Sequence, residues 1–538
     1  MTEHSDPVRG YSQPDRCWTF TNVSEATPDI LSPLCWSVWD RPLQETLLAS
    51  LAALGVLSRS DVVVSSDQNF NGTGVIYGRQ AFNVDVMREV MSKVPGMNID
   101  DFERDLLGTV RPNASTPPGA SLWRIPLIAA KAPYALVSSA REVERNYHAT
   151  KAWWRSEVFN VHQGAPPKRP PLEDLLYARD RFARSFYLHA FTRFALVSIQ
   201  GAVCKTAARI GVPALGTAAL AGQGGVTETQ LAEDTWRLAR GEMGIASFLA
   251  EYGYRGPNEG NVYTKSWREQ PDRVRAMAKA QANRAELERP TVRAQRAAEA
   301  ARDAAASLIG AVGAKDRVLL RFMLARARTV IPRLEIGKAA YVMPLDGVRA
   351  AARRLGAELT RQGLLEQIDD VFFLAIPELQ LLAARQLTEA PELVQYRKAT
   401  RETYREMTLP VHFTGMPEPL VTTAASPQTD EPIFLTGAAS GGGTVEGRAR
   451  VLLDPNDDIE LDDGDILVCK FTDPSWAPLF TLADALVIDL GGAASHGAVV
   501  AREIGIPYVI GTQTGTTIIR DGDRLRVDGN NNLVTILP

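Results

Sequence analysis

The chain of 538 residues is 45% hydrophobic and 23% charged, and 59 basic against 63 acidic residues leave a formal net charge of -4. Because a single hydrophobic core rarely organises so long a chain, we expect roughly two to four domains. The near-balanced charge argues against nucleic acid as the main partner, and the lack of apolar runs of about 18 residues argues against a membrane span.

The N-terminal sequence and the cysteines indicate the cellular compartment. MTEHSDPVRGYSQPDRC is polar and has no apolar core of the kind found in signal peptides, so we expect a cytoplasmic protein. The four cysteines, Cys17, Cys35, Cys204 and Cys469, form no CxxC pair and no Cys/His ligand cluster. We therefore interpret them as reduced thiols, and the sequence offers no convincing metal site.

Residues 1–421 are predicted to form one mainly helical domain. Strand signals there are sparse, and the clearest are VVVSS near Val62 and GVIYG near Val75. Two stretches rich in proline and glycine, residues 111–121 and 162–171, are typical of surface loops.

The helices of this region are best defined in its second half. Residues 272–312 are rich in helix-forming residues and are interrupted only around Pro290. Thr227 or Thr229 is a candidate N-cap for the helix that continues as QLAEDTWRLARGEM. Two further helices are expected over residues 315–330 and 346–362, the second followed directly by a glycine, Gly363, as its C-terminal cap.

Residues 422–444 are predicted to be a flexible linker, because they are rich in small residues and end in three consecutive glycines. After the linker, residues 445–538 alternate short β-branched runs with turns: ARVLL, DILVCKF, ALVID, YVIGT, RLRVDG and LVTIL. One helix over residues 498–504 interrupts the strands. This pattern predicts a compact α/β domain.

The strongest chemical signal is the segment ALVIDLGGAASHGAVVAREIGIP in that domain, which reads as strand, small-residue loop and helix. No bulky neighbour shields the imidazole of His496, which lies between Ser495 and Gly497. The following helix would direct its N-terminal N–H groups and dipole at a bound dianion. A neutral imidazole is a nucleophile near pH 7, so these residues suit a phosphohistidine; a histidine that only caps the helix is the alternative.

The segments GDILVCKFTDPSWAPLF and ALVIDLGGAASHGAVVAREIGIPYVIGT together resemble the mobile phosphohistidine domain of the phosphoenolpyruvate-utilising enzymes. The SHGA form is most similar to the rifampin phosphotransferases. Three upstream segments, FTNVSEATPDILSPLCWSVW, EYGYRGPNEGNVYTKSWREQP and GLLEQIDDVFFLAIPEL, resemble the acceptor-binding domain of those enzymes. The resemblance implies a mainly α-helical acceptor-binding domain followed by a small swivelling α/β phosphohistidine domain.

One departure from the family bears on mechanism. The acceptor-like region begins near residue 18, which leaves no room for the family's ATP-binding domain, and no GxxxxGK[ST] motif occurs. We therefore expect a separate ATP-grasp-like subunit that binds ATP and Mg2+ and charges His496, as in the two-subunit phenylphosphate and methylphenyl phosphate synthases.

Several other residues are candidates for the site. Ser495 is expected to hydrogen-bond the phosphoryl group or the ring, whereas Arg502 either binds phosphate or pairs with Glu503 or another nearby carboxylate. Thr472 and Asp473 are expected to shape the adjacent loop. Glu335 and Lys338 are three residues apart and share a helix face, where a cation would hold the phosphoryl group and a carboxylate would accept the hydroxyl proton.

The resemblance adds support for this helix, because a similar Arg/Glu/Lys cluster lies at the transfer site of the rifampin phosphotransferases. Arg333 is displaced by one position from that spacing, and an exposed charged helix face is the alternative. In YRGPNEG, Arg255, Asn258 and Glu259 form a polar loop that either reaches the site or only stabilises its own turn.

An acceptor with a hydroxyl group requires an apolar pocket. Aromatic residues that either line this pocket or belong to the core are Trp18, Phe20, Trp36, Trp39, Phe372 and Phe373. The expected function is transfer of a phosphoryl group from ATP, through His496, to a small phenol or alkylphenol, with AMP and phosphate as the other products. A rifamycin-like antibiotic acceptor and a non-enzymatic phosphocarrier or regulatory module that binds a protein are the alternatives.

Overall fold

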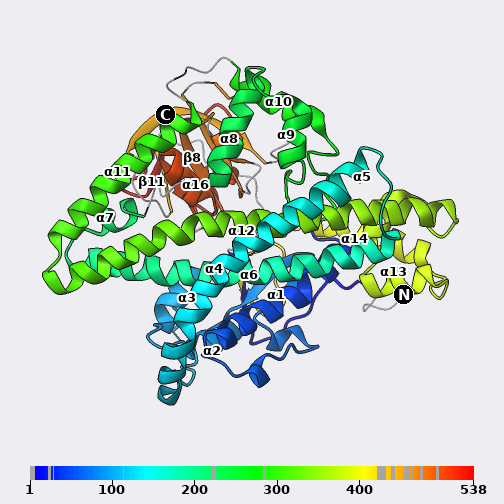
Figure 1. The fold of residues 1–538 in the computed structure, drawn as a ribbon, viewed down its shortest axis with the longest axis horizontal. Helices are drawn as coiled ribbons and strands as arrows, with labels where there is room; N and C mark the ends of the chain where they lie inside the picture. The colour runs from blue at the N-terminus through cyan, green and yellow to red at the C-terminus, as the bar shows by residue number, and fades with distance from the viewer. Residues whose placement is uncertain are drawn as a thin grey trace. The chain divides into compact units, whose positions relative to one another are not determined.

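The structure is a computed structural model of the chain (Figure 1). It describes residues 6–537 except 22, 24–25, 28, 113, 221–225, 283–285, 287–288, 421–431, 438–442, 454–460, 463, 473–475, 481 and 492–495. The chain divides into two compact units. Unit 1 consists of Met1–Phe191, Asn258–Lys265 and Ala340–Ala424, and unit 2 consists of Thr192–Pro257, Ser266–Ala339 and Ala425–Pro538.

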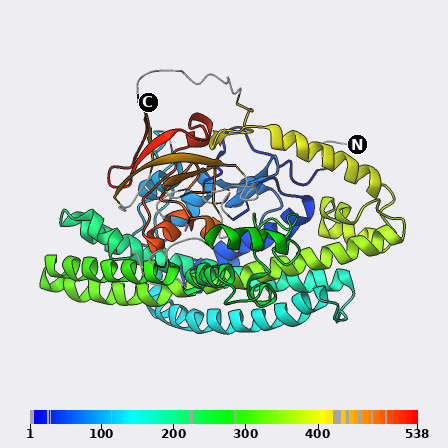
Figure 2. The same ribbon diagram turned by 90° about the horizontal axis from the view of Figure 1, so that it is seen from above.

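Unit 1 is mainly helical around a small sheet. Its helices are α1 (Pro33–Ala53), α2 (Val84–Ser92), α3 (Ile99–Leu107), α4 (Ile125–Trp154), α5 (Asn160–His162), the first part of α6 (Pro171–Arg209), the last part of α12 (Ala314–Arg361), α13 (Ile376–Ala383) and α14 (Ala390–Glu406). Its strands are β1 (Cys17–Thr19), β2 (Thr73–Ile76), β3 (Arg79–Asn83) and β4 (His412–Thr414), in the antiparallel order β2-β3-β1-β4. The N-terminal part of the unit is blue in Figure 2.

Strand β2 is an edge strand, and two glutamine side chains cover its outer backbone. Gln68 Oε1 accepts a hydrogen bond from the Val75 N–H (3.1 Å), and Gln68 Nε2 donates to the Val75 carbonyl (3.3 Å). Gln44 Nε2, from α1, donates to the Thr73 carbonyl (2.7 Å). The backbone groups that the sheet leaves unpaired at these positions are thus satisfied within the unit.

Unit 2 combines a helical part with a larger sheet. Its further helices are α7 (Pro213–Ala218), α8 (Val226–Ala239), α9 (Ile245–Tyr252), α10 (Pro271–Gln281), α11 (Pro290–Ala311), α15 (Ala477–Phe480), α16 (His496–Ile504) and α17 (Gly515–Ile518). Its strands are β5 (Ile433–Thr436), β6 (Thr444–Leu452), β7 (Asp465–Cys469), β8 (Ala485–Ile488), β9 (Tyr508–Ile510), β10 (Arg524–Asp528) and β11 (Leu533–Leu537).

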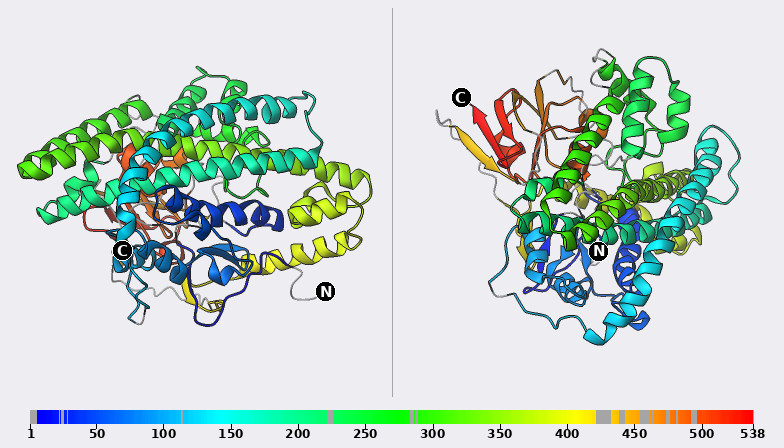
Figure 3. Two further views of the ribbon diagram at one scale, coloured as in Figure 1. Left: turned by 60° about the horizontal axis from the view of Figure 1, so that its bottom comes forward. Right: turned by 60° about the vertical axis from the view of Figure 1, so that its left-hand side comes forward.

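The helical part of unit 2 is held by an alanine- and leucine-rich core. Val203 and Ala207 of α6, Leu308 of α11, and Leu320 and Leu324 of α12 are all buried in one cluster, and Figure 3 shows these helices running side by side. In addition, Glu233 of α8 accepts hydrogen bonds from Arg289 Nε (2.8 Å) and Thr291 Oγ1 (3.1 Å), which connects α8 to the start of α11.

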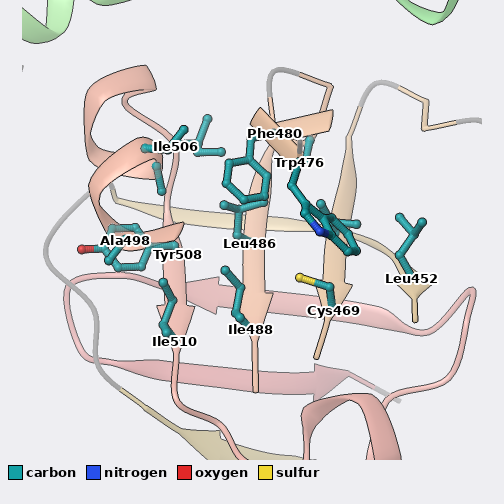
Figure 4. Packing of buried hydrophobic residues seen from close by; sticks show 14 residues of the cluster. Leu452, Cys469, Trp476, Phe480, Leu486, Ile488, Ala498, Ile506, Tyr508 and Ile510 are labelled. Carbon is teal, nitrogen blue, oxygen red and sulfur yellow. The ribbon is translucent and has the colours of Figure 1, made fainter. Parts of the chain in front are cut away.

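The sheet of unit 2 has the order β5-β11-β10-β6-β7-β8-β9, in which β6 to β9 are parallel and β10, β11 and β5 are antiparallel. Alternate residues face opposite sides, so the sheet has an apolar cluster on each face. The cluster beneath α15 and α16 includes Trp476, Phe480, Leu486, Ile488 and Tyr508 (Figure 4). The parallel strands β7, β8 and β9 are buried on both faces, which explains why they read as continuous apolar runs in the sequence.

The predicted character of the two regions is confirmed in outline: the region before residue 421 is mainly helical, and the C-terminal region is α/β. Two details differ. The helices expected over residues 315–330 and 346–362 are one continuous helix, α12, which continues through Pro332 and Pro344. Buried residues on both sides of Pro344, including Met343 and Leu345, provide packing that offsets the lost backbone hydrogen bond.

The second difference concerns the predicted linker. Residues 433–436, within it, form β5, which pairs with β11. Most of the other residues of the 422–444 segment lie outside the described residues. The strand signal near Val75 corresponds to β2, whereas the one near Val62 corresponds to no strand.

Candidate active site

His496 is the first residue of α16, at the end of the sheet where β7, β8 and β9 have their carboxyl termini. Gly497, the next residue, is buried against this edge. A Cβ atom at Gly497 would lie 2.6 Å from Thr472 Oγ1 and 2.9 Å from Ile488 Cδ1. Glycine therefore lets the first turn of α16 lie this close to the strand ends without displacing these two side chains.

The N-terminus of α16 has the properties of an anion site. The first N–H groups of a helix have no partner within it, and the helix dipole is positive at this end. Such a helix end stabilises a bound phosphoryl group. Ser495 and the side chain of His496 lie outside the described part of the structure.

Arg502 lies six residues after His496, about 9 Å along the helix axis. The guanidinium of Arg502 acts electrostatically on Cys204 of α6: burial raises the pKa of this thiol, and Arg502 partly opposes that effect. Because α16 ends at Ile504, Arg502 lies in its last turn, at the helix end opposite His496.

Two loops from neighbouring strands meet the backbone that leads to His496. Thr472, after β7, is buried, whereas Asp473 lies outside the described residues. After β9, the Gly511 N–H donates to the Ile488 carbonyl (2.8 Å), and Thr512 Oγ1 donates to Asp489 Oδ1 (2.7 Å). Sequence reasoning missed Asp489 and Thr512, although an acidic residue directly after a buried strand was the available signal.

The Arg333/Glu335/Lys338 group lies near the middle of α12, within unit 2. Glu335 Oε2 accepts a hydrogen bond from the Thr227 N–H (3.2 Å), in the first turn of α8. Arg333 donates to the Thr329 carbonyl one turn earlier, and Lys338 is half-buried. Thr227 is thus inside α8 rather than at its N-cap, and the carboxylate of Glu335 satisfies one of the N–H groups at the helix start.

Arg255 reaches the same helix end. Its side chain is fully buried and forms an ion pair with Glu228 (3.0 Å), the residue after Thr227. Arg255 and Glu335 are therefore both attached to the first turn of α8. Glu259 is buried in unit 1, where its backbone carbonyl accepts a hydrogen bond from Arg349, and the loop YRGPNEG is divided between the two units.

The candidate pocket aromatics are core residues of unit 1. The buried set is Trp18, Phe20, Trp36, Trp39, Phe372 and Phe373. Trp39 donates from Nε1 to the Gly260 carbonyl (2.9 Å), and its ring contacts those of Phe182 (4.7 Å) and Phe186 (5.2 Å). All four cysteines are free thiols. In the described ranges, no group of three or more metal-ligating side chains occurs, and no helix is long and apolar enough to cross a membrane.

Two parts of the chain match domains of known families. Residues 461–532 match the mobile domain of the phosphoenolpyruvate-utilising enzymes, and residues 207–335 match the fourth domain of rifampicin phosphotransferase. Residues 461–532 are therefore similar to a mobile domain of the phosphoenolpyruvate-utilising type, as the sequence indicates. The second match covers α7 to α11 and the first part of α12. The matched residues include both Arg255 and Glu335.

Curated relatives share the same regions. The chain is 34% identical over 303 residues to rifampicin phosphotransferase of Streptomyces sviceus, which covers 54% of this chain and 34% of the relative. It is 39% identical over 219 residues to that of a Streptomyces species (40% of this chain, 25% of the relative). It is 33% identical over 215 residues to that of Bacillus cereus (40% and 24%). The matched part of the chain thus spans 34% or less of the length of these relatives.

Proposed function

We propose that this chain is a phosphotransferase that carries a phosphoryl group on His496 and delivers it to a hydroxyl group of a small acceptor. The observation that supports this most directly is the position of His496. It begins α16 at the carboxyl edge of the parallel strands, beside a glycine that is packed closely against Thr472 and Ile488, in a segment of the mobile-domain type.

The proposed chemistry consists of two transfers. In the first, a neutral ring nitrogen of His496 attacks the β-phosphorus of ATP, so that an N–P bond forms, the P–O bond to the α-phosphate breaks and AMP leaves. Water then releases the terminal phosphate of this pyrophosphoryl group as inorganic phosphate, and one phosphoryl group stays on His496. In the second, the acceptor oxygen attacks the same phosphorus, the N–P bond breaks, and the hydroxyl proton passes to a base. The sum is acceptor, ATP and water giving phosphate ester, AMP and inorganic phosphate.

The side chains that contact the start of α8, together with Lys338 of α12, are proposed to receive the phosphoryl group from His496. The charges of Arg255 and Lys338 would neutralise the transferring phosphoryl group, and Glu335 would accept the hydroxyl proton. Arg333 and Glu259 are further candidates for binding the phosphoryl group or the acceptor. ATP and Mg2+ are proposed to bind an ATP-grasp-like domain or subunit, and residues 445–538 to swing between the two sites.

The relatives change the order in which acceptors are proposed. Because three relatives bear the name rifampicin phosphotransferase, a rifamycin-type hydroxyl is the first acceptor class to test. A phenol or alkylphenol is second, since it was favoured only by the expected two-subunit organisation. A phosphocarrier that never discharges to a small molecule is the non-enzymatic alternative.

The test combines the full chain, a candidate ATP-binding subunit and ATP labelled separately at the β- and γ-phosphate, with rifamycins and phenols offered in parallel. We expect labelled His496 and one labelled ester class, and no ester with His496→Ala. An ester formed by His496→Ala would refute the central step. A wild-type chain that is labelled and never discharges would support the carrier alternative.

A further inference from the structure

Asp489, the residue directly after β8, has a buried carboxylate that gathers several hydrogen bonds. Its side chain is 3% exposed. It accepts from Thr512 Oγ1 (2.7 Å), from the Thr516 N–H (3.0 Å to Oδ2) and from the Thr516 hydroxyl. Because a carboxylate has only acceptor sites, all of these donors can be satisfied at once.

These donors belong to residues 511–516, named here the 511–516 loop, which follow β9 and include the first two residues of α17. The loop follows the shape of Asp489 closely: a Cβ atom at Gly515 would lie 2.7 Å from Asp489 Oδ1. Gln513 has a left-handed backbone, with a φ of 63°, and its N–H donates to the Asp489 carbonyl (3.1 Å). A non-glycine residue is retained in this costly conformation only where its surroundings fix it.

The same residues fix the backbone that leads to His496. The Asp489 N–H donates to the Cys469 carbonyl (3.1 Å), and the Leu490 N–H donates to the Lys470 carbonyl (2.9 Å). On the other side, the Gly491 carbonyl lies against Gly511, where an added Cβ would be only 3.0 Å away. This segment is therefore held between the end of β7 and the 511–516 loop.

We propose that Asp489 is a positioning residue for phosphoryl transfer: its carboxylate holds the 511–516 loop in a fixed position beside the backbone that leads to His496. This inference rests on the proposed function of His496. The reason is geometric, because a displacement of about 1 Å at a reacting group can slow a reaction by about a hundredfold. Asparagine in place of Asp489 would direct an amide donor at a loop that already presents donors.

The test charges the full-length chain with phosphoramidate, a small phosphoryl donor that needs no ATP-binding partner. The ring nitrogen forms the N–P bond, the P–N bond of phosphoramidate breaks, and the nitrogen leaves as ammonia. Phosphohistidine is followed by intact mass and 31P NMR over a range of donor concentrations. We expect Asp489→Asn to reduce the limiting rate about tenfold or more.

Asp465 provides the matched control. It is equally buried, at 2% exposure, and accepts hydrogen bonds from Arg448 Nε (2.9 Å) and the Asp462 N–H (2.9 Å), but it starts β7 and so lies at the opposite edge of the sheet. Asp465→Asn should lower the melting temperature as much as Asp489→Asn and leave the rate unchanged. The Thr516→Val variant, which lacks the hydroxyl that donates to Asp489, should be phosphorylated slowly. The Thr516→Ser variant keeps the hydroxyl and should react at the wild-type rate.

The outcomes separate the two proposals. No labelling of wild type, or equal labelling of His496→Ala, would refute the proposed function. Labelling of wild type at His496 with an unchanged rate in Asp489→Asn would overturn the positioning role alone. Equal slowing of the Asp489→Asn and Asp465→Asn variants, in proportion to their melting temperatures, would also overturn it, because general loss of stability would then explain the result.

Discussion

The carboxylate of Glu335, near the middle of α12, accepts a hydrogen bond from the backbone N–H of Thr227, 3.2 Å away at the start of α8. The next residue of α8, Glu228, forms the buried ion pair with Arg255. A residue proposed to act as a base thus also stabilises a helix terminus. These two roles predict different results for two substitutions.

Glu335→Gln separates the roles. The amide oxygen of glutamine can still accept from Thr227, whereas a neutral amide cannot take a proton from the acceptor hydroxyl. We expect the melting temperature to stay near that of wild type and ester formation to fall about a hundredfold. Glu335→Ala should in addition lose about 0.5–2 kcal/mol, as other helix caps do. Normal turnover by Glu335→Gln would show that Glu335 serves only as a cap.

Removing one member of the Arg255–Glu228 pair is expected to lower the unfolding free energy much more than replacing both members with apolar residues. Arg255→Met or Glu228→Leu alone breaks this buried ion pair, at a cost of about 3–5 kcal/mol in unfolding free energy. The double variant Arg255→Met/Glu228→Leu should recover most of this loss, measured by urea denaturation. If Arg255 binds phosphate as proposed, the recovered double variant will still fail to form ester.

Gly497→Ala should prevent phosphorylation of His496. The new methyl group would meet Thr472 Oγ1 and Ile488 Cδ1 at less than van der Waals distance, so either these side chains or the start of α16 must shift, at a cost of about 1–3 kcal/mol. Labelling by phosphoramidate measures the loss, and Gly497→Ala/Thr472→Ala should regain part of it. Gly310→Ala in α11 is the control: an added Cβ there meets no atom within 4 Å, so this change should be neutral or stabilising.

His412 should make the stability of unit 1 depend on pH. Burial lowers the pKa of His412, whose Nδ1 lies 2.9 Å from Thr19 Oγ1. The unfolded chain therefore binds a proton more readily than the folded one. Stability is fully present above about pH 6.5 and is lost as pH falls through the lower pKa of the folded state.

The measurement is the urea midpoint between pH 5 and pH 8. His412→Asn keeps a hydrogen-bonding group near Thr19 and has no titration in this range, so its midpoint should fall less towards pH 5 than that of wild type. His148→Asn, at an exposed position on α4, should behave as wild type. Parallel curves for wild type and His412→Asn would contradict the prediction.

The sequence was most informative where local pattern and burial agree. Each β-branched run of the C-terminal region predicted its strand, from β6 to β11. The signal was strongest for β7, β8 and β9, which are buried on both faces, whereas β10 alternates exposed and buried residues. The start of the helix at His496 was predicted within two residues from the small-residue loop. By contrast, the break expected between residues 330 and 346 does not occur, and α12 continues through this segment with its two prolines, Pro332 and Pro344.

The site was predictable only where the residues concerned are close in sequence. His496 and Gly497 follow from one motif. The Glu335–Thr227 and Arg255–Glu228 contacts join residues that are 108 and 27 positions apart, and the helix arrangement that creates them has no local signal. Asp489 was missed for the same reason, since its partners Thr512 and Thr516 follow a later strand.

The two glutamines beside β2 have a consequence for stability. All four residues of β2 are buried, and Gly10 lies against the Val75 carbonyl, so this edge of the sheet is covered within the unit. The Val75 N–H and carbonyl and the Thr73 carbonyl bond to Gln68 and Gln44 where a neighbouring strand would otherwise bond to them. Gln68→Leu would leave the buried backbone groups of Val75 without these partners, so unit 1 should lose about 1–3 kcal/mol in unfolding free energy although no apolar contact is removed.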